Sequence, residues 1–119
     1  MDYEDFCHEI LRIDPGVRFA GIVDINGEIR YGGERSGITR LFTVEETKRS
    51  VLQAIDRWEL RNDLAYRIGK GKYSMAEYEK LKRITVPVDE THLLLVSTEP
   101  FTDHGKVIDG ILRLKLLLR

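Results

Sequence analysis

Apolar positions recur along this chain with two spacings, and these spacings predict its helices and strands. Near the N-terminus they are three or four residues apart, as on one face of a helix, and they predict a helix over residues 2–13. Asp14-Pro15-Gly16 ends this helix, because proline disfavours helical geometry in the residue before it. The residues of the predicted buried face are Tyr3, Phe6, Cys7, Ile10 and Leu11.

A β-hairpin is predicted directly after this helix. Residues 17–24 are apolar on both faces, which is typical of an interior strand. Asn26-Gly27 accepts the positive φ angles of a two-residue hairpin turn, and residues 28–31 return with one polar face, as in a strand nearer the edge of a sheet. We expect Gly32-Gly33 to end this second strand. Simple alternation places Val17, Phe19, Gly21 and Val23 on one face of the first strand, and Ala20 and Ile22 on the other.

A long helix is predicted after a loop over residues 33–42. The loop has no clear period, and we expect Leu41 and Phe42 at its end to dock on the core. Thr43-Val44-Glu45-Glu46 is a capping box, which predicts that a helix begins there. The helical period then continues for roughly 25 residues, longer than a small domain is wide. We therefore expect a break or an exposed, partner-seeking end at residues 61–63.

The next segment has two interpretations and is followed by two strands. Residues 69–82 form either a strand or a short helix, because Ser74-Met75-Ala76-Glu77 can be a second capping box. Residues 83–88 are rich in β-forming side chains, and Pro87 places the end of that strand at an edge, a bulge or a terminus. Residues 93–96 are an unbroken apolar run, as in a strand that is covered on both faces.

A final helix is predicted to begin near Thr102-Asp103, and it is apolar on more than one side. Such a broad apolar surface indicates burial under a sheet and contact with another chain. The expected core stripe is Val107, Ile111, Leu114 and Leu118, joined by Ile108, Leu112, Leu116 and Leu117.

Composition narrows the class of protein. The 119 residues fit one domain, residues 1–119, and no apolar run approaches the ~18–20 residues of a membrane-spanning helix. The acidic N-terminus is unlike a secretory signal, and the lone Cys7 suits a reducing cytoplasm and a buried packing role. The net charge of −1 does not favour a nucleic-acid partner. We therefore expect a cytoplasmic domain with neither a nucleic acid nor a membrane as partner.

The order of these elements resembles the Roadblock family, a sibling of profilin-like and longin domains, and in particular small stand-alone Roadblock-like proteins of archaea. The resemblance rests on Asp14-Pro15-Gly16, the strand 17–24, the Asn26-Gly27 turn and the apolar strand 93–97 before a final helix. It implies an α+β fold with a single-layer antiparallel sheet flanked by helices, in the order α-β-β-α-β-β-α. The connection 62–78 departs from the family by its length and charge, as does the long second helix.

Candidate sites are few. Arg67, Lys70 and Lys72 form the one local basic cluster, which is either a solvated turn or an anion or nucleotide site. Trp58 fits the core stripe of the long helix, but tryptophan is also favoured at interfaces, so Trp58 and Tyr66 are the candidate interface anchors. The three histidines lack metal-ligand spacing and no serine has a nucleophile-elbow context. We predict no catalytic residue, no cofactor and no metal site.

Two functions of different classes remain. The resemblance implies a non-enzymatic regulatory module, a homodimer built through the second helix and the neighbouring edge strand, which acts with a small GTPase or another signalling partner. The alternative is a small-molecule sensor of PAS or profilin-like type, whose ligand lies between the sheet and the helices. A cavity under a helix favours the sensor, whereas an exposed apolar surface favours the interaction module.

Overall fold

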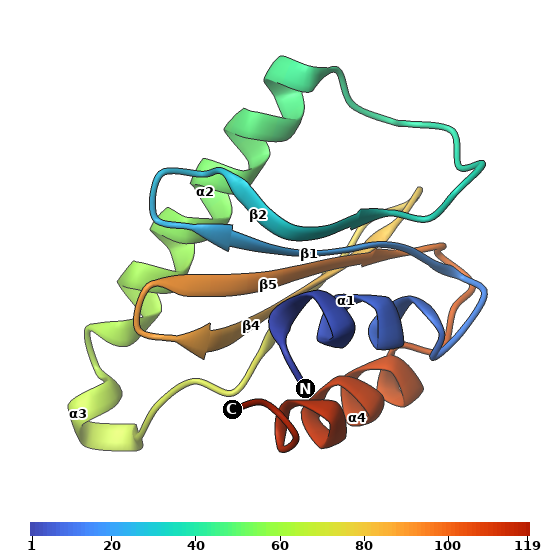
Figure 1. Ribbon diagram of the computed structural model, residues 1–119. Coiled ribbons are helices and arrows are strands. Elements are labelled where there is room, and N and C mark those ends of the chain that lie inside the picture. The colour runs from blue at the N-terminus through green and yellow to red at the C-terminus, as the bar shows by residue number, and fades with distance from the viewer.

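A five-stranded antiparallel sheet forms the middle layer of the structure, a computed structural model that describes residues 1–119. Helix α2 (Val44–Asn62) covers one face, and helices α1 (Tyr3–Leu11) and α4 (His104–Lys115) cover the other (Figure 1). The strands lie in the order β2-β1-β5-β4-β3. Their bounds are β1 (Val17–Asp24), β2 (Ile29–Glu34), β3 (Ser74–Glu77), β4 (Lys82–Asp89) and β5 (His92–Thr98). The predicted α+β class is confirmed.

Strand β5 is the centre of the sheet and divides the core into two parts. Its neighbours are β1 and β4, so both its edges are paired. Leu94 and Val96 belong to the core under α1 and α4, whereas Leu93 and Leu95 belong to the smaller core under α2. The unbroken apolar run predicted this burial on both faces, because successive side chains of a strand point to opposite faces.

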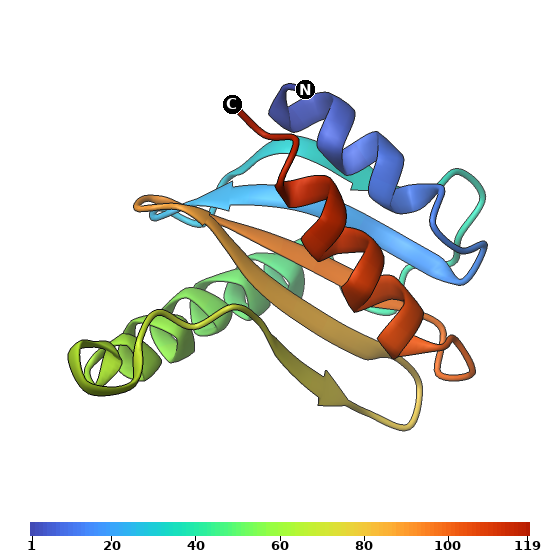
Figure 2. The same cartoon turned by 90° about the horizontal axis from the view of Figure 1, so that it is seen from below.

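Helices α1 and α4 lie side by side on one face of the sheet, as the view from below shows (Figure 2). Asp2 caps α1 by accepting from the Asp5 N–H at 2.8 Å, and Asp103 caps α4 by accepting from the Lys106 N–H at 3.2 Å. The two chain ends meet here, and the Met1 ammonium donates to the Leu117 carbonyl at 3.2 Å. None of the four helices combines the length and apolar character that a bilayer-spanning segment needs.

The β1–β2 hairpin forms as predicted, but its turn is not the expected two-residue turn. The Gly27 N–H donates to the Asp24 carbonyl and the Asp24 N–H donates to the Glu28 carbonyl, both at 3.0 Å, which makes a three-residue loop. Only Gly27 has a positive φ, at +82°, so Asn26 does not adopt the left-handed conformation that a two-residue turn of this kind needs. Strand β2 also continues through Gly32 and Gly33 to Glu34 rather than ending there.

The first strand confirms the prediction for Phe19 and Val23, which pack under α2, but not for Val17. Val17 faces α1 and α4 instead, in the larger core. The register of β1 against β5 shifts between Val17 and Phe19, so a bulge turns the start of the strand by one side chain. Simple alternation fails wherever such a bulge occurs.

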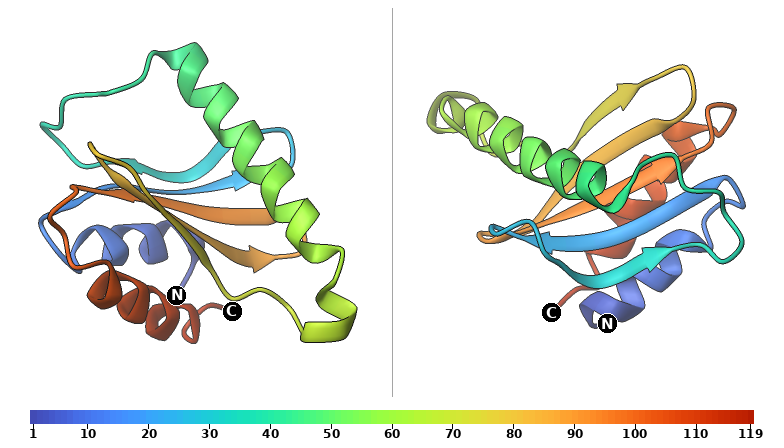
Figure 3. Two further views of the ribbon diagram at one scale, coloured as in Figure 1. Left: turned by 180° about the vertical axis from the view of Figure 1, so that it is seen from behind. Right: turned by 90° about the horizontal axis from the view of Figure 1, so that it is seen from above.

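Helix α2 begins and ends where the sequence predicted. Both bonds of the capping box are present: the Glu46 N–H donates to Thr43 Oγ1 at 3.1 Å, and the Thr43 N–H donates to Glu46 Oε1 at 2.9 Å. The helix breaks after Asn62, and a single turn, α3 (Ala65–Ile68), extends beyond the sheet (Figure 3). Leu41 and Phe42 do not dock on the core as expected; they are 47% and 43% exposed.

Of the two interpretations of residues 69–82, the structure shows the strand. Ser74–Glu77 forms β3 and pairs with the first half of β4. This strand and α3 are additional to the predicted order of elements. Pro87 lies at a register shift between β4 and β5, which is one of the places where a sheet tolerates proline. At the other end of the chain, Leu116 and Leu117 are exposed beyond α4 rather than joining its core stripe.

Candidate functional site

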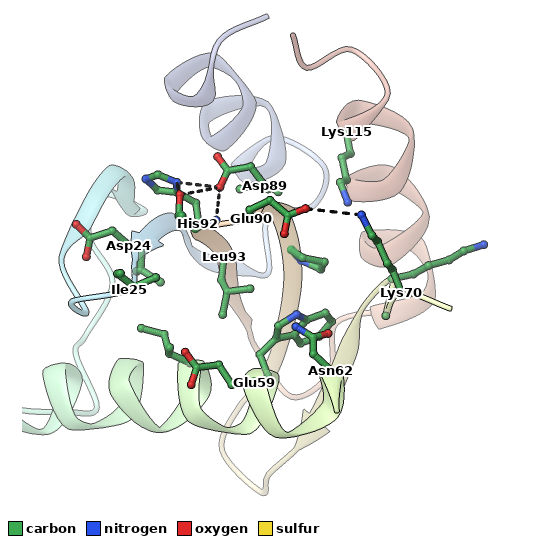
Figure 4. Close-up of a pocket in the computed structure, with 18 of the residues that line it drawn as sticks. Asp24, Ile25, Glu59, Asn62, Lys70, Asp89, Glu90, His92, Leu93 and Lys115 are labelled. Carbon is green, nitrogen blue, oxygen red and sulfur yellow. Dashed lines mark hydrogen bonds and ion pairs between the residues drawn. The ribbon is translucent and has the colours of Figure 1, made fainter. Parts of the chain in front are cut away.

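Among the grooves on the surface, one lies at the β4–β5 turn. This turn groove has a volume of about 980 Å³ and lies between the turn, the end of α2, residues 70–72 and the end of α4 (Figure 4). Both acidic and basic side chains line it. Its charged lining residues are Asp24, Glu59, Lys70, Lys72, Asp89, Glu90 and Lys115. With both signs present at its rim, the turn groove shows no preference for a ligand of one charge.

Trp58 forms part of the wall of the turn groove. Its side chain is only 6% exposed and packs with Val23, Ile55 and Leu93 in the core under α2. The chain passes directly over the indole at Gly71, where a Cβ would lie 3.1 Å from the ring. Trp58 is therefore mainly a packing residue, although it also lines the groove.

The structure separates the residues of the predicted basic cluster. Lys70 and Lys72 line the turn groove, whereas Arg67 lies outside it with its guanidinium 5.3 Å from the centre of the Tyr66 ring. The Lys70 ammonium is 3.7 Å from the Glu90 carboxylate, and both side chains are fully solvated. The three cations do not converge on one point, and an anion site at this cluster stays a prediction.

A hydrogen-bonded network around Asp89 holds the β4–β5 turn and was not anticipated from the sequence. Asp89 accepts from the Tyr3 hydroxyl at 2.6 Å and from the Thr91 N–H at 2.7 Å, and the His92 ring lies 3.0 Å away. Burial raises the pKa of Asp89, but the bonds from Tyr3, Thr91 and His92 outweigh burial and hold the pKa far below its usual range. Burial and the bond to Asp89 also raise the pKa of Tyr3 to about 12. The network joins α1 to the sheet.

The burial of Lys82 is a second feature that the sequence did not indicate. Lysine is almost never buried without a partner. The side chain is 7% exposed, and its ammonium donates to the Thr102 carbonyl at 2.7 Å and lies 3.0 Å from His104 Nδ1. These contacts join β4 to the start of α4. The neutral nitrogen of a histidine accepts a hydrogen bond, so the contact fits an unprotonated Nδ1 on His104.

The second groove lies between the first half of α2 and the sheet, and we call it the helix groove. Its volume is about 450 Å³, and the loop over residues 38–42 forms its outer wall. Phe19 and Leu95 form the floor, and Val51 lies on the helix side. Four basic side chains also line it, namely Arg18, Arg40, Lys48 and Arg83. The groove combines an apolar floor with a charged rim.

The arrangement of the side chains gives little support for a cysteine nucleophile or a metal site. Cys7 is fully buried under β2, and burial, with a smaller effect of Glu4, raises the pKa of its thiol to about 12. A thiol with such a pKa is not a nucleophile at neutral pH. No three histidine, cysteine or acidic side chains are grouped closely enough to hold a metal ion.

Comparison with known proteins identifies the fold. No curated protein matches the sequence significantly. A Roadblock/LC7 domain from Streptomyces avermitilis superimposes with a TM-score of 0.72 at 11% identity, over 98% of this chain and 94% of that one. The gliding protein MglB from Thermus thermophilus gives 0.76 at 17%, over 93% and 81%. A further MglB structure, described as having a tetrameric arrangement, gives 0.76 at 18%, over 93% and 80%.

At such low sequence identities, these superpositions show a shared fold alone. They confirm the fold expected from the resemblance to Roadblock domains. Membership of a family rests on the sequence itself. One family model matches residues 1–114, which is nearly the whole chain. The chain belongs to DUF6659, a family of unknown function.

Proposed function

We propose that this chain is a non-enzymatic regulatory module of Roadblock type that acts in the cytoplasm as a homodimer and binds a small GTPase or another signalling protein. The observation that carries the proposal is a pair of unpartnered features, the open edge of β3 and the apolar end of α2 with α3, which residues 69–73 connect. We call the two features together the edge surface, and it comprises residues 57–68 and 73–78.

The edge of β3 is the first part of this surface. Strand β3 has only four residues and pairs with β4 on one side alone, so its other edge has free backbone donors and acceptors. Such an edge is a ready template for another strand, and proteins normally cover or pair it. A two-fold axis beside β3 pairs the same edge of two copies and covers both.

The end of α2 and the turn α3 supply the apolar part. Leu60, Leu64, Tyr66 and Ile68 are all exposed there, and Tyr66 and Ile68 are 77% and 84% exposed. Exposed apolar side chains that gather on one part of a surface mark an interaction site. Tyr66 is the proposed anchor, and Trp58, which lines the turn groove, extends the same contact.

Relatives of the fold support self-association. The MglB structure with a tetrameric arrangement has a TM-score of 0.76 to this chain. A stable contact between two copies needs about 1,000 Å² of buried surface in total. An edge of four residues is too short to supply this area alone, so the proposal needs α2 and α3 as well as β3.

Sedimentation velocity at micromolar concentration tests the homodimer. We expect a mass of about twice the 13.8 kDa of one chain, falling toward the monomer on dilution. A mass of 13.8 kDa that does not change up to high micromolar concentration contradicts self-association. It also leaves a different protein as the partner that covers the edge surface.

The helix groove favours a second candidate function, the small-molecule sensor. It lies between the sheet and a helix, where a ligand of a PAS-like sensor is expected, and its volume of about 450 Å³ is within the range of roughly 300–1,000 Å³ for small-molecule sites. The residues that line the groove are not among those of the edge surface, although Arg57 and Tyr78 of that surface lie close to Arg83. Both functions can therefore be carried by one chain.

A further inference from the structure

We propose that the helix groove binds a small molecule with a single carboxylate and an apolar body, and that Arg83 holds the carboxylate. The proposal rests on the second candidate function and does not require that the chain forms a dimer. Three observations carry it: the pairing of the charges around the groove, the position of Arg83 on the sheet, and the apolar side chains of the groove wall that are exposed to solvent.

The charges of the groove balance except at Arg83. Of the four basic side chains that line it, three have an acidic partner within ion-pair distance, whereas no carboxylate lies within that distance of Arg83. The three pairs are Arg18 with Glu99 at 2.5 Å, Arg40 with Glu34 at 2.6 Å and Lys48 with Glu28 at 3.3 Å. One unpaired positive charge remains.

The position of Arg83 makes this charge costly to leave unpaired. Arg83 is half-buried on the face of the sheet that α2 covers. Burial lowers the pKa of Arg83, Tyr78 opposes this effect, and the cation of Arg57 lowers the pKa by a smaller amount. A desolvated cation beside a like charge destabilises the protein unless an anion compensates it. A carboxylate on Arg83 supplies that compensation, and the planar guanidinium can bind it through two parallel hydrogen bonds.

Small neighbours leave room for the carboxylate. Phe19, Ser97, Arg83 and Ala76 are cross-strand partners in one row, so their side chains lie on the same face of the sheet. Ser97 and Ala76, on either side of Arg83, are too short to cover its guanidinium, and the nearby Tyr78 supplies a hydroxyl but no carboxylate. Phe19, one strand further, begins the apolar floor. A ligand that reaches Arg83 with its carboxylate therefore lays its apolar part along this floor.

The apolar walls of the groove are the reason for proposing an apolar body in the ligand. Leu41 and Phe42 line the groove but are 47% and 43% exposed, so apolar surface faces solvent on the outer wall. An apolar body between this wall and Val51 removes that surface from water. The carboxylates of Glu28 and Glu34 also line the groove, which disfavours a second negative charge on the ligand.

Calorimetric titration with octanoate tests the proposal, because octanoate has one carboxylate and an apolar tail. We expect octanoate to bind, and octanol, which lacks the charge, and acetate, which lacks the tail, to bind at least tenfold more weakly. Arg83→Met keeps an apolar side chain of similar length and removes the charge. We expect it to weaken octanoate binding at least tenfold.

Arg113→Met is the matched control, since Arg113 is an exposed arginine of α4 that lies neither in the groove lining nor in the edge surface. It should bind octanoate within a factor of about two of the unchanged chain. Equal binding of octanoate and octanol, or unchanged binding of octanoate by Arg83→Met, overturns the proposal that Arg83 recognises a carboxylate. The groove would then still bind an apolar ligand. No binding of octanoate or octanol at millimolar concentration overturns the groove as a ligand site as well.

The mass of Arg83→Met in a sedimentation experiment distinguishes the ligand proposal from the proposal of self-association. Arg83→Met should sediment as the unchanged chain does. If the substitution changes the mass and octanoate does not bind, the partner of Arg83 is a carboxylate of a second copy and the ligand proposal is wrong.

Discussion

Gly32 shows how one residue allows two layers to meet. Its φ is +76°, and a Cβ at this position would lie 2.7 Å from the Cβ of Cys7 on α1 and would collide with the Ala20 carbonyl. Its N–H donates to the Glu4 carboxylate at 3.1 Å. Only glycine combines this backbone conformation with such a close approach of helix and sheet.

Substitution of this glycine tests the contact. We expect Gly32→Ala to lower the free energy of unfolding by roughly 2–5 kcal/mol, the sum of the left-handed backbone cost and of overpacking. Gly37→Ala is the control, because Gly37 has a φ of +80° but open space around its Cα. It should cost only about 1 kcal/mol. Equal costs in urea melts would show that the contact with α1 adds nothing.

Asp89 makes stability depend on pH. Its pKa is depressed in the folded protein, so its contribution to stability is present above the ordinary aspartate pKa of about 3.9 and is lost as pH falls toward the folded pKa. We expect Asp89→Asn to be less stable than the unchanged chain at about pH 6, and the difference to shrink at about pH 2.5. Urea melts at the two pH values measure this. A difference that is the same at both would assign the effect to geometry and not to charge.

At the scale of elements, the N-terminus of α2 depends on its cap. Thr43 and Glu46 exchange two hydrogen bonds, and the bond from the Thr43 backbone, followed by that from its side chain, lowers the pKa of Glu46. We expect Thr43→Ala to lower the free energy of unfolding by ~1 kcal/mol. Thr39→Ala, in the exposed loop before the helix, is the control and should change stability by less than ~0.5 kcal/mol. A urea melt that Thr43→Ala leaves unchanged would contradict the cap.

The elements also show where prediction from sequence is secure. The capping box and the break near residue 62 depend on contacts within a few residues of chain, and both were predicted. The sequence does not decide between strand and helix for residues 74–77, because a four-residue segment has no period of its own and only its pairing with β4 makes it a strand. The face of Val17 was predicted wrongly, because a bulge depends on the register against β5.

At the scale of the whole molecule, the proposed dimer depends on side chains that a monomer leaves exposed. We expect Tyr66→Ala to shift the monomer–dimer equilibrium toward the monomer by about tenfold or more in dissociation constant, measured by sedimentation equilibrium. Ile29→Ala is the control, because Ile29 is 43% exposed but lies on β2, at the opposite edge of the sheet from β3. A similar shift for both substitutions would mean that self-association does not use the edge surface.

The sequence by itself determined the fold class, the helix–hairpin–helix order and the two-sided burial of β5, because these depend on periodicity and on short-range capping and turn chemistry. It did not determine the candidate sites. Arg83 and the other charged residues that line the helix groove, such as Glu28 and Glu34, are far apart in the chain, as are Lys82 and His104, so only the tertiary structure decides which charges find partners. Exposure of Leu41, Phe42 and Tyr66 is likewise decided by packing between layers. Local pattern specifies which residues can be buried, and only tertiary structure decides which charges and apolar side chains remain unpaired.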